Sequence, residues 1–81
     1  MKTTFTKVHE TEEAATFFEL TEYRSGETFE MNHTYYKTRE AASKAGAEAR
    51  EAWGSNLVFL GSSPKEINGE TFFENGFNVW N

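Results

Sequence analysis

The side chains of this sequence that could do acid–base or metal chemistry are two histidines and thirteen glutamates, with no cysteine and no aspartate. His9 and His33 lie far apart, and neither stands in the HExxH spacing that turns two histidines toward one metal ion. Glycosidases use paired carboxylates, but they need a cleft larger than a chain of 81 residues can frame. We therefore expect no enzyme, no metal site and no cofactor.

Seven of the glutamates fall between positions 10 and 30, where Arg24 is the single basic residue. The rest of the chain is nearly balanced, so this segment should carry most of the formal net charge of −5. Such a charge disfavours direct nucleic-acid binding and favours a protein partner with a basic surface. The predicted partner-binding residues combine carboxylates with aromatic area: Phe17, Glu19, Glu22, Tyr23, Glu30 and Tyr36. The alternative is an ordinary solvated sheet face.

Two strands must position these residues. Residues 14–23 and 28–36 alternate as strands do, and residues 24–27 (RSGE) between them supply a turn, so together they predict a β-hairpin. On the first strand Phe17, Glu19 and Tyr23 are expected to point outward. On the second strand His33 shares a face with Phe29, Met31 and Tyr35, where we expect it to be partly buried and hydrogen-bonded. Residues 3–9 predict a further strand.

A capped amphipathic helix follows at residues 39–53. Thr38 can accept a hydrogen bond from an amide of the first turn, and Gly54 can adopt the left-handed conformation that ends helices. One side of the helix carries alanines, Gly46 and Trp53, so its backbone can lie close to a sheet. Trp53 is expected to be the single large anchor of this face.

Short strands are predicted at residues 57–60, 71–74 and 77–80. The run LVFL at 57–60 favours a central strand covered on both faces, residues 61–64 a loop, and Asn68-Gly69 and Asn75-Gly76 two hairpin turns. The predicted fold class is α+β: a small antiparallel sheet packed by one Ala-rich helix, in the order β-β-β-α-β-β-β, as a single domain over residues 1–81. One helix covers one face of a sheet, so the terminal hairpin, a second copy or a partner must close the other.

The chain has no run of about 20 apolar residues that would span a bilayer, and its first residues lack the apolar segment of a signal peptide. A cytoplasmic protein without membrane contact is therefore expected. Exposed tyrosines can stack on bases, but those of this sequence stand among glutamates rather than basic residues. A nucleic-acid-binding domain is accordingly the weakest alternative.

Residues 41–62, AASKAGAEAREAWGSNLVFLGS, resemble the Ala-rich helix, Trp-Gly-Ser stop and short strand of a small phage-encoded anti-CRISPR protein. The resemblance implies a protein-binding inhibitor of a bacterial CRISPR–Cas complex of type I, with a Cas subunit or the surveillance complex as partner. It carries over no binding residues. From the sequence, we expect the inhibitor to occupy a basic surface through its acidic, aromatic hairpin. A small homodimeric interaction module is the alternative.

Overall fold

The computed structural model describes residues 1–80. These residues form five strands and one helix in the order β-β-β-α-β-β, so the α+β class is confirmed and the prediction of a sixth strand is wrong. The elements are β1 (Lys2–Glu10), β2 (Ala14–Glu22), β3 (Thr28–Tyr36), α1 (Arg39–Trp53), β4 (Leu57–Ile67) and β5 (Glu70–Val79).

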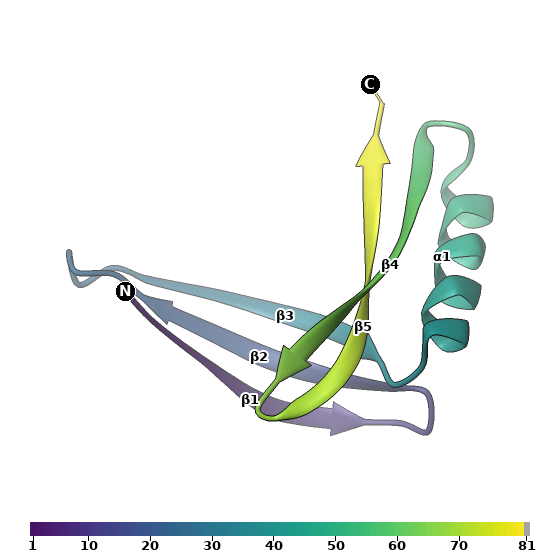
Figure 1. The fold of residues 1–81 in the computed structure, drawn as a ribbon. Helices are drawn as coiled ribbons and strands as arrows, with labels where there is room; N and C mark the ends of the chain where they lie inside the picture. Colours follow the sequence, from purple (N-terminus) through teal and green to yellow (C-terminus); the bar gives the residue numbers. More distant parts are fainter. Residues whose placement is uncertain (81) are drawn as a thin grey trace.

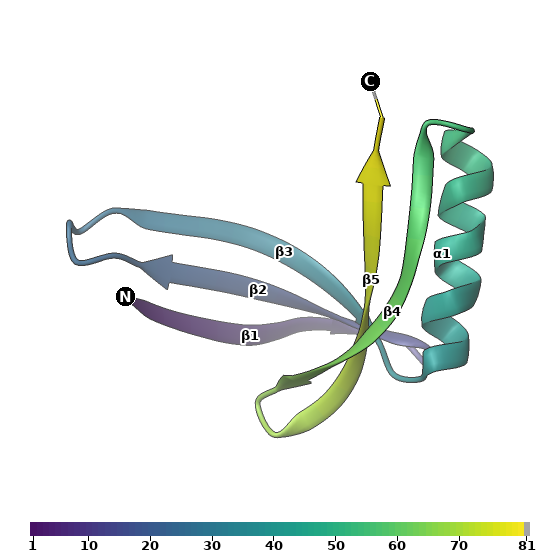
Figure 2. The same ribbon diagram turned by 45° about the horizontal axis from the view of Figure 1, so that its top comes forward.

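The strands form an antiparallel sheet in the spatial order β1-β2-β3-β5-β4 (Figure 1). β1, β2 and β3 make a meander, and β4 and β5 make a long bent hairpin. Among the described residues, the meander and the hairpin share a single register pair, Tyr36 with Phe73. Beyond that pair the meander runs one way and the hairpin another, which leaves the sheet open and gives the molecule extents of 40 × 33 × 18 Å (Figure 2).

The C-terminal hairpin differs most from the prediction. Asn68-Gly69 does form its turn, with φ angles of 51° and 86°. Asn75-Gly76, by contrast, lies inside β5 opposite Ser62 and Gly61, so the predicted second turn and the predicted loop at residues 61–64 are both wrong. The Asn75 side chain accepts a hydrogen bond from Ser62 Oγ (2.6 Å) and donates one to the Ala42 carbonyl of α1 (2.8 Å). These bonds hold Asn75 in an extended strand.

The helix follows the prediction at both ends. Thr38 Oγ1 accepts from the Ala41 amide at 3.1 Å, and Gly54 has φ 105° with its N–H bonded to the Arg50 carbonyl. The predicted anchor is wrong, since Trp53 is 64% exposed. Phe59 of β4 takes its place: a Cβ at Gly46 would lie 2.7 Å from Phe59 Cε2, so only glycine lets the ring approach the helix this closely.

Two small cores result. The half of the hairpin nearest its turn folds over one face of the meander, here called the inner face, and buries Ala15, Phe17, Tyr35, Ile67 and Phe72. Phe17 meets Phe72 edge to face, with ring centroids 5.4 Å apart. The other half of the hairpin, residues 54–63 and 75–80, packs on α1 through Phe59, whose ring also contacts that of Phe77, and we call it the arm.

The prediction that β4 is a central strand is wrong, because β4 lies at the edge of the sheet. A bulge between Phe59 and Gly61 interrupts its pairing with β5, and Gly61 has φ 110° there. Val58 alternates with Phe59 and so points away from α1, Leu60 is the extra residue of the bulge, and both are exposed.

Candidate protein-binding surface

The six predicted partner-binding residues do not form one surface. β2 and β3 pair in a register that sets Glu22 opposite Thr28 and Ala14 opposite Tyr36, so even-numbered residues of both strands share the outer face. Glu22, Glu30 and Tyr36 therefore lie on the outer face. Odd-numbered residues lie on the inner face, where Phe17 is only 1% exposed and packs in the core. The expectation that Phe17, Glu19 and Tyr23 point outward is thus wrong, because all three lie on the inner face, which the hairpin covers at Phe17. Tyr23, just beyond β2, remains exposed.

The glutamates of residues 10–30 are divided between the two ends of the meander. Glu10 stands near the β1–β2 turn, with its carboxylate 2.7 Å from Lys37 Nζ and 3.5 Å from Lys7 Nζ. The hydrogen bond and charge of Lys37 lower the pKa of the Glu10 carboxyl below its usual range, with a smaller effect from Lys7. At the other end Lys2 lies opposite Glu22 in the register of β1 with β2. Basic residues therefore offset the acidic segment along β1.

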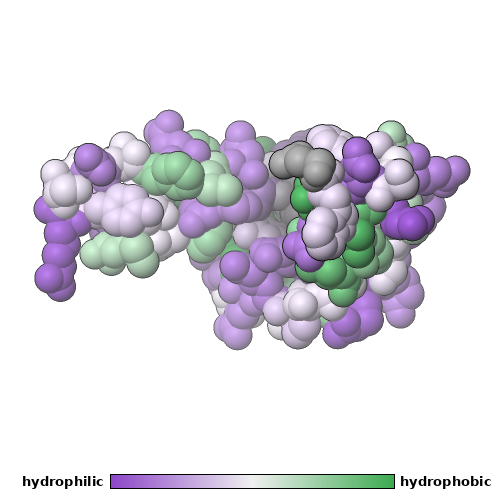
Figure 3. Space-filling view, turned by 90° about the horizontal axis from the view of Figure 1, so that it is seen from above, coloured by the Kyte–Doolittle hydropathy of each residue, from purple (hydrophilic) through white to green (hydrophobic). Residues whose placement is uncertain are grey.

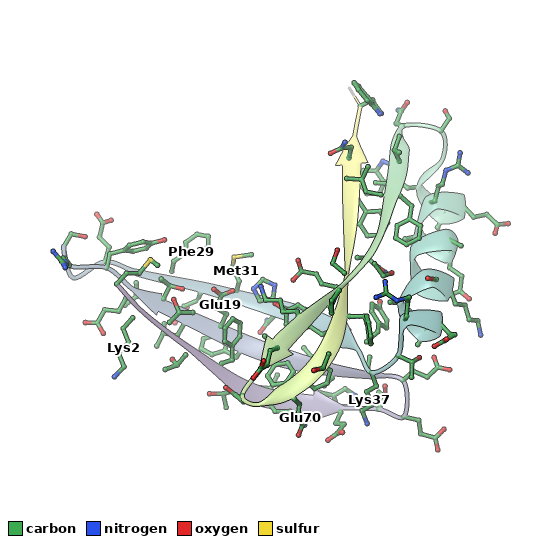
Figure 4. The ribbon with its side chains drawn as sticks, in the orientation of Figure 1. Lys2, Glu19, Phe29, Met31, Lys37 and Glu70 are labelled. Carbon is green, nitrogen blue, oxygen red and sulfur yellow. The ribbon has the colours of Figure 1, made fainter. Side chains whose placement is uncertain are left out.

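Glu19 projects from the inner face of β2 and serves a structural role (Figure 4). Its carboxylate accepts hydrogen bonds from Thr21 Oγ1 (3.3 Å) and from the His33 ring. The His33 ring stacks on Tyr35, with centroids 5.5 Å apart and planes 17° from parallel. His33 is therefore partly buried and hydrogen-bonded, as the sequence predicted, and Glu19 is engaged within the protein.

Tyr35 is the buried end of the same cluster. Burial, together with the nearby carboxylates of Glu74 and Glu19, raises the pKa of Tyr35 to about 12. Lys65 stands over the Tyr35 ring at 5.9 Å and forms an ion pair with Glu74. The phenol is held protonated among partnered groups, an arrangement that stabilises the inner core.

The open edge of β3 is the feature that the sequence did not predict. Tyr23 N–H donates to the Glu27 carbonyl and Lys37 N–H to the Glu13 carbonyl, so the odd-numbered residues of β3 and its flanks bond to β2. Backbone groups alternate along an antiparallel strand, hence those of the even-numbered residues point away from β2. Tyr36 meets Phe73 of β5. The remaining outward groups pair with no strand of residues 1–80: the N–H and C=O of Thr28, Glu30, Asn32 and Thr34.

The two outermost strands carry the features that protect sheet edges from pairing. β1 has a bulge between Lys7 and His9 and exposes lysines, while β4 has a bulge after Phe59 and carries Pro64 and Lys65. β3 has none of these: its register with β2 is unbroken from Thr28 to Tyr36, and it contains no proline, lysine or arginine. It is the exposed edge best suited to accept another strand.

A groove of 530 Å³ lies where β3 and β5 diverge. Residues 32–36 of β3 form one wall, and Glu74, Asn75 and Phe77 of β5 with Ala45 and Ala49 of α1 form the other. An extended segment placed along the β3 edge would run into this groove. Farther along the inner face, Phe29 and Met31 are exposed beside that edge (Figure 4).

The side chains of residues 1–80 include no cluster of three or more potential ligands that could hold a metal ion. The single helix described here is too short and too polar to cross a membrane. No family model, curated protein or solved structure matches this chain.

Proposed function

We propose that this protein is a protein-binding inhibitor of a bacterial CRISPR–Cas complex, acting in the cytoplasm, and that it binds by pairing the open edge of β3 with an extended segment of its partner. The observation that carries the binding mode is the row of outward backbone groups at Thr28, Glu30, Asn32 and Thr34. Strand addition satisfies such a row with main-chain hydrogen bonds, while neighbouring side chains select the sequence that binds.

The charge along this edge favours a basic segment. Glu30 lies in β3 and Glu27 directly precedes this strand, whereas the lysines of β1 lie at the opposite edge of the meander. On the inner face, Phe29 and Met31 offer exposed apolar area beside the same edge. A partner strand would therefore place lysine or arginine on the outer side, next to Glu30, and apolar side chains on the inner side, next to Met31.

The β3 edge is poorly suited to pairing with itself. Two copies of β3 joined antiparallel around Met31 would place Glu30 of one copy diagonally across from Glu30 of the other. Like charges at that spacing disfavour the pair, so a basic partner is the better match.

The inhibitor class rests on the resemblance over residues 41–62, which form α1 and the first part of β4. These elements are scaffold, tied to β5 by the pairing of β4 and by the hydrogen bond from Asn75 to Ala42, and the binding surface is a separate inference. Binding by surface occupation also agrees with the engagement of Glu19 and His33 in internal hydrogen bonds.

The strand-addition step can be tested with a defined probe: a peptide of about eight residues that alternates lysine and valine, compared with one that alternates glutamate and valine. Amide hydrogen exchange of the labelled protein is the readout. We expect the basic peptide to slow exchange at Thr28, Glu30, Asn32 and Thr34, because their N–H groups gain acceptors. Protection confined to β1, or equal protection by the acidic peptide, would overturn the binding mode.

Proline substitutions at the two edges of the meander give a test variant and a matched control for strand addition at β3. Asn32→Pro removes an outward N–H of β3 and costs no bond to β2. Thr3→Pro is the control at the opposite edge of the meander. The Phe5 carbonyl points away from β2 and accepts a hydrogen bond from the Asn68 side chain, so the backbone N–H of Thr3, two residues earlier, also points away from β2. With a purified type I surveillance complex, wild type and Thr3→Pro should reduce target-DNA binding, and Asn32→Pro should not. If the protein binds the lysine–valine peptide but does not reduce DNA binding by the surveillance complex, the inhibitor class is rejected and the strand-addition mode is retained.

A further inference from the structure

The arm carries no charge. Residues 54–63 and 75–80 contain no Lys, Arg, Asp or Glu, although charged residues make up 26% of the whole chain. Large apolar side chains are nevertheless exposed on the arm and beside it, by between 38% and 64%. They are Val58, Leu60, Val79 and Trp80 of the arm and the adjacent Trp53 at the end of α1. Figure 3 shows the strongly hydrophobic atoms gathered over this end of the molecule. An exposed apolar region without charge is typical of a protein interface.

The arm also has an open strand edge. Trp80 N–H donates to the Asn56 carbonyl at 2.8 Å, which fixes the even-numbered residues of β5 as those bonded to β4. The odd-numbered residues therefore turn their N–H and C=O groups away from β4. Phe73 meets β3, but Asn75, Phe77 and Val79 pair with no strand of the described chain. α1 packs mainly on β4, so the helix leaves this edge of β5 uncovered.

We propose that the arm is a homodimer interface in which β5 pairs antiparallel with β5 of a second copy. A two-fold axis at Phe77 sets this residue opposite itself and Asn75 opposite Val79 of the second copy, which forms about six backbone hydrogen bonds. The two hairpins become one sheet of four strands, with both helices on the same face. On the other face, Leu60 and Trp80 of each copy join one continuous apolar surface.

Charge singles out a second copy as the occupant. Each chain carries a formal net charge of −5, so two copies repel wherever charged faces approach. The arm is where they can meet through uncharged side chains. Glu74, just before the arm on β5, falls opposite Trp80 of the second copy, and its carboxylate is already paired with Lys65 of its own chain. A strongly basic partner, by contrast, would find no carboxylate on the arm. Added salt should therefore leave the dimer intact or strengthen it.

The mass of the full chain, measured by sedimentation from about 5 to about 500 μM, tests the proposal. We expect a monomer–dimer equilibrium that persists at roughly 1 M salt, where attraction between surface charges is screened. Val79→Lys places a charge at the β5 edge and should raise the dissociation constant at least about tenfold. Val8→Lys is the matched control, since Val8 is 56% exposed and Val79 53%, and it should dimerise as wild type does.

A cross-linking experiment defines the register. Asn78 is diagonal to Asn78 of the second copy, at roughly 7–8 Å, so Asn78→Cys should cross-link with a short bifunctional thiol reagent. The native chain has no cysteine, and Asn56→Cys, just before the outer strand β4, should dimerise without forming the cross-link. A wild type that is monomeric throughout, or a dimer unaffected by Val79→Lys, would overturn the proposal. The β3 and β5 edges border the same groove, so the peptide test of the β3 edge is made at a protein concentration at which the chain is monomeric.

Discussion

Tyr36 of β3 and Phe73 of β5 are the one register pair through which the meander and the hairpin join within the described sheet. Arg39 follows closely on β3, and its guanidinium lies 4.9 Å from the Phe73 ring and donates to the Ser62 carbonyl at 2.8 Å. The junction is thus tied by side chains while the strands on either side diverge. This divergence leaves the β3 edge and the β5 edge both unpaired, which is the basis of the two proposed interfaces.

Gly46 should be essential to the packing of α1 on the arm. Gly46→Val drives a branched side chain into the Phe59 ring, and we expect a loss of about 2–3 kcal/mol in the free energy of unfolding from overpacking. Ala47→Val is the control on the exposed side of the same helix and should cost only about 0.6 kcal/mol in helix propensity. Urea unfolding measures both. Equal losses in the two variants would show that Phe59 moves aside without cost.

Tyr35 should make the fold sensitive to alkali. Its pKa is raised from 10.0 to about 12, so the folded chain holds the phenol proton more tightly than the unfolded chain does. This contribution to stability is complete below pH 10 and is lost as the pH rises from 10 toward 12. We expect the urea midpoint of wild type to fall across this range more steeply than that of Tyr35→Phe. Tyr36→Phe, on the other face of β3, should keep the wild-type slope.

Asn75 should anchor the helix to β5. Asn75→Ala removes the donor to the Ala42 carbonyl and the acceptor of Ser62 Oγ, and we expect a loss of about 1–2 kcal/mol in unfolding free energy. Asn78→Ala removes an exposed asparagine from the same strand and should change stability by less than about 0.5 kcal/mol. Thermal unfolding of both proteins checks this. If the two behave alike, the Asn75 hydrogen bonds do not hold the arm together.

Local signals in the sequence predicted the elements whose ends are set by local chemistry. Thr38 and Gly54 define α1 through their own caps, and alternation around residues 28–36 defines β3. Asn75-Gly76 has a strong local turn signal, but hydrogen bonds from distant Ser62 and to Ala42 hold it extended. The face of Phe17 depends on which side the hairpin covers, and the opening of the β3 edge depends on where β5 turns away. Neither is encoded in a short segment.

The carboxylates beside the β3 edge should act separately from its backbone groups. Glu27→Lys with Glu30→Lys leaves the outward N–H and C=O groups in place but reverses the local charge, so binding of the lysine–valine peptide should weaken at low salt. The difference from wild type should shrink as salt rises, because exposed charges are screened over about 8 Å at physiological ionic strength. Glu48→Lys with Glu51→Lys makes the same change in net charge on α1 and should leave the affinity near that of wild type. Calorimetric titration at two salt concentrations separates these cases. Equal weakening by both double variants would mean that overall charge, rather than the β3 edge, attracts the basic segment.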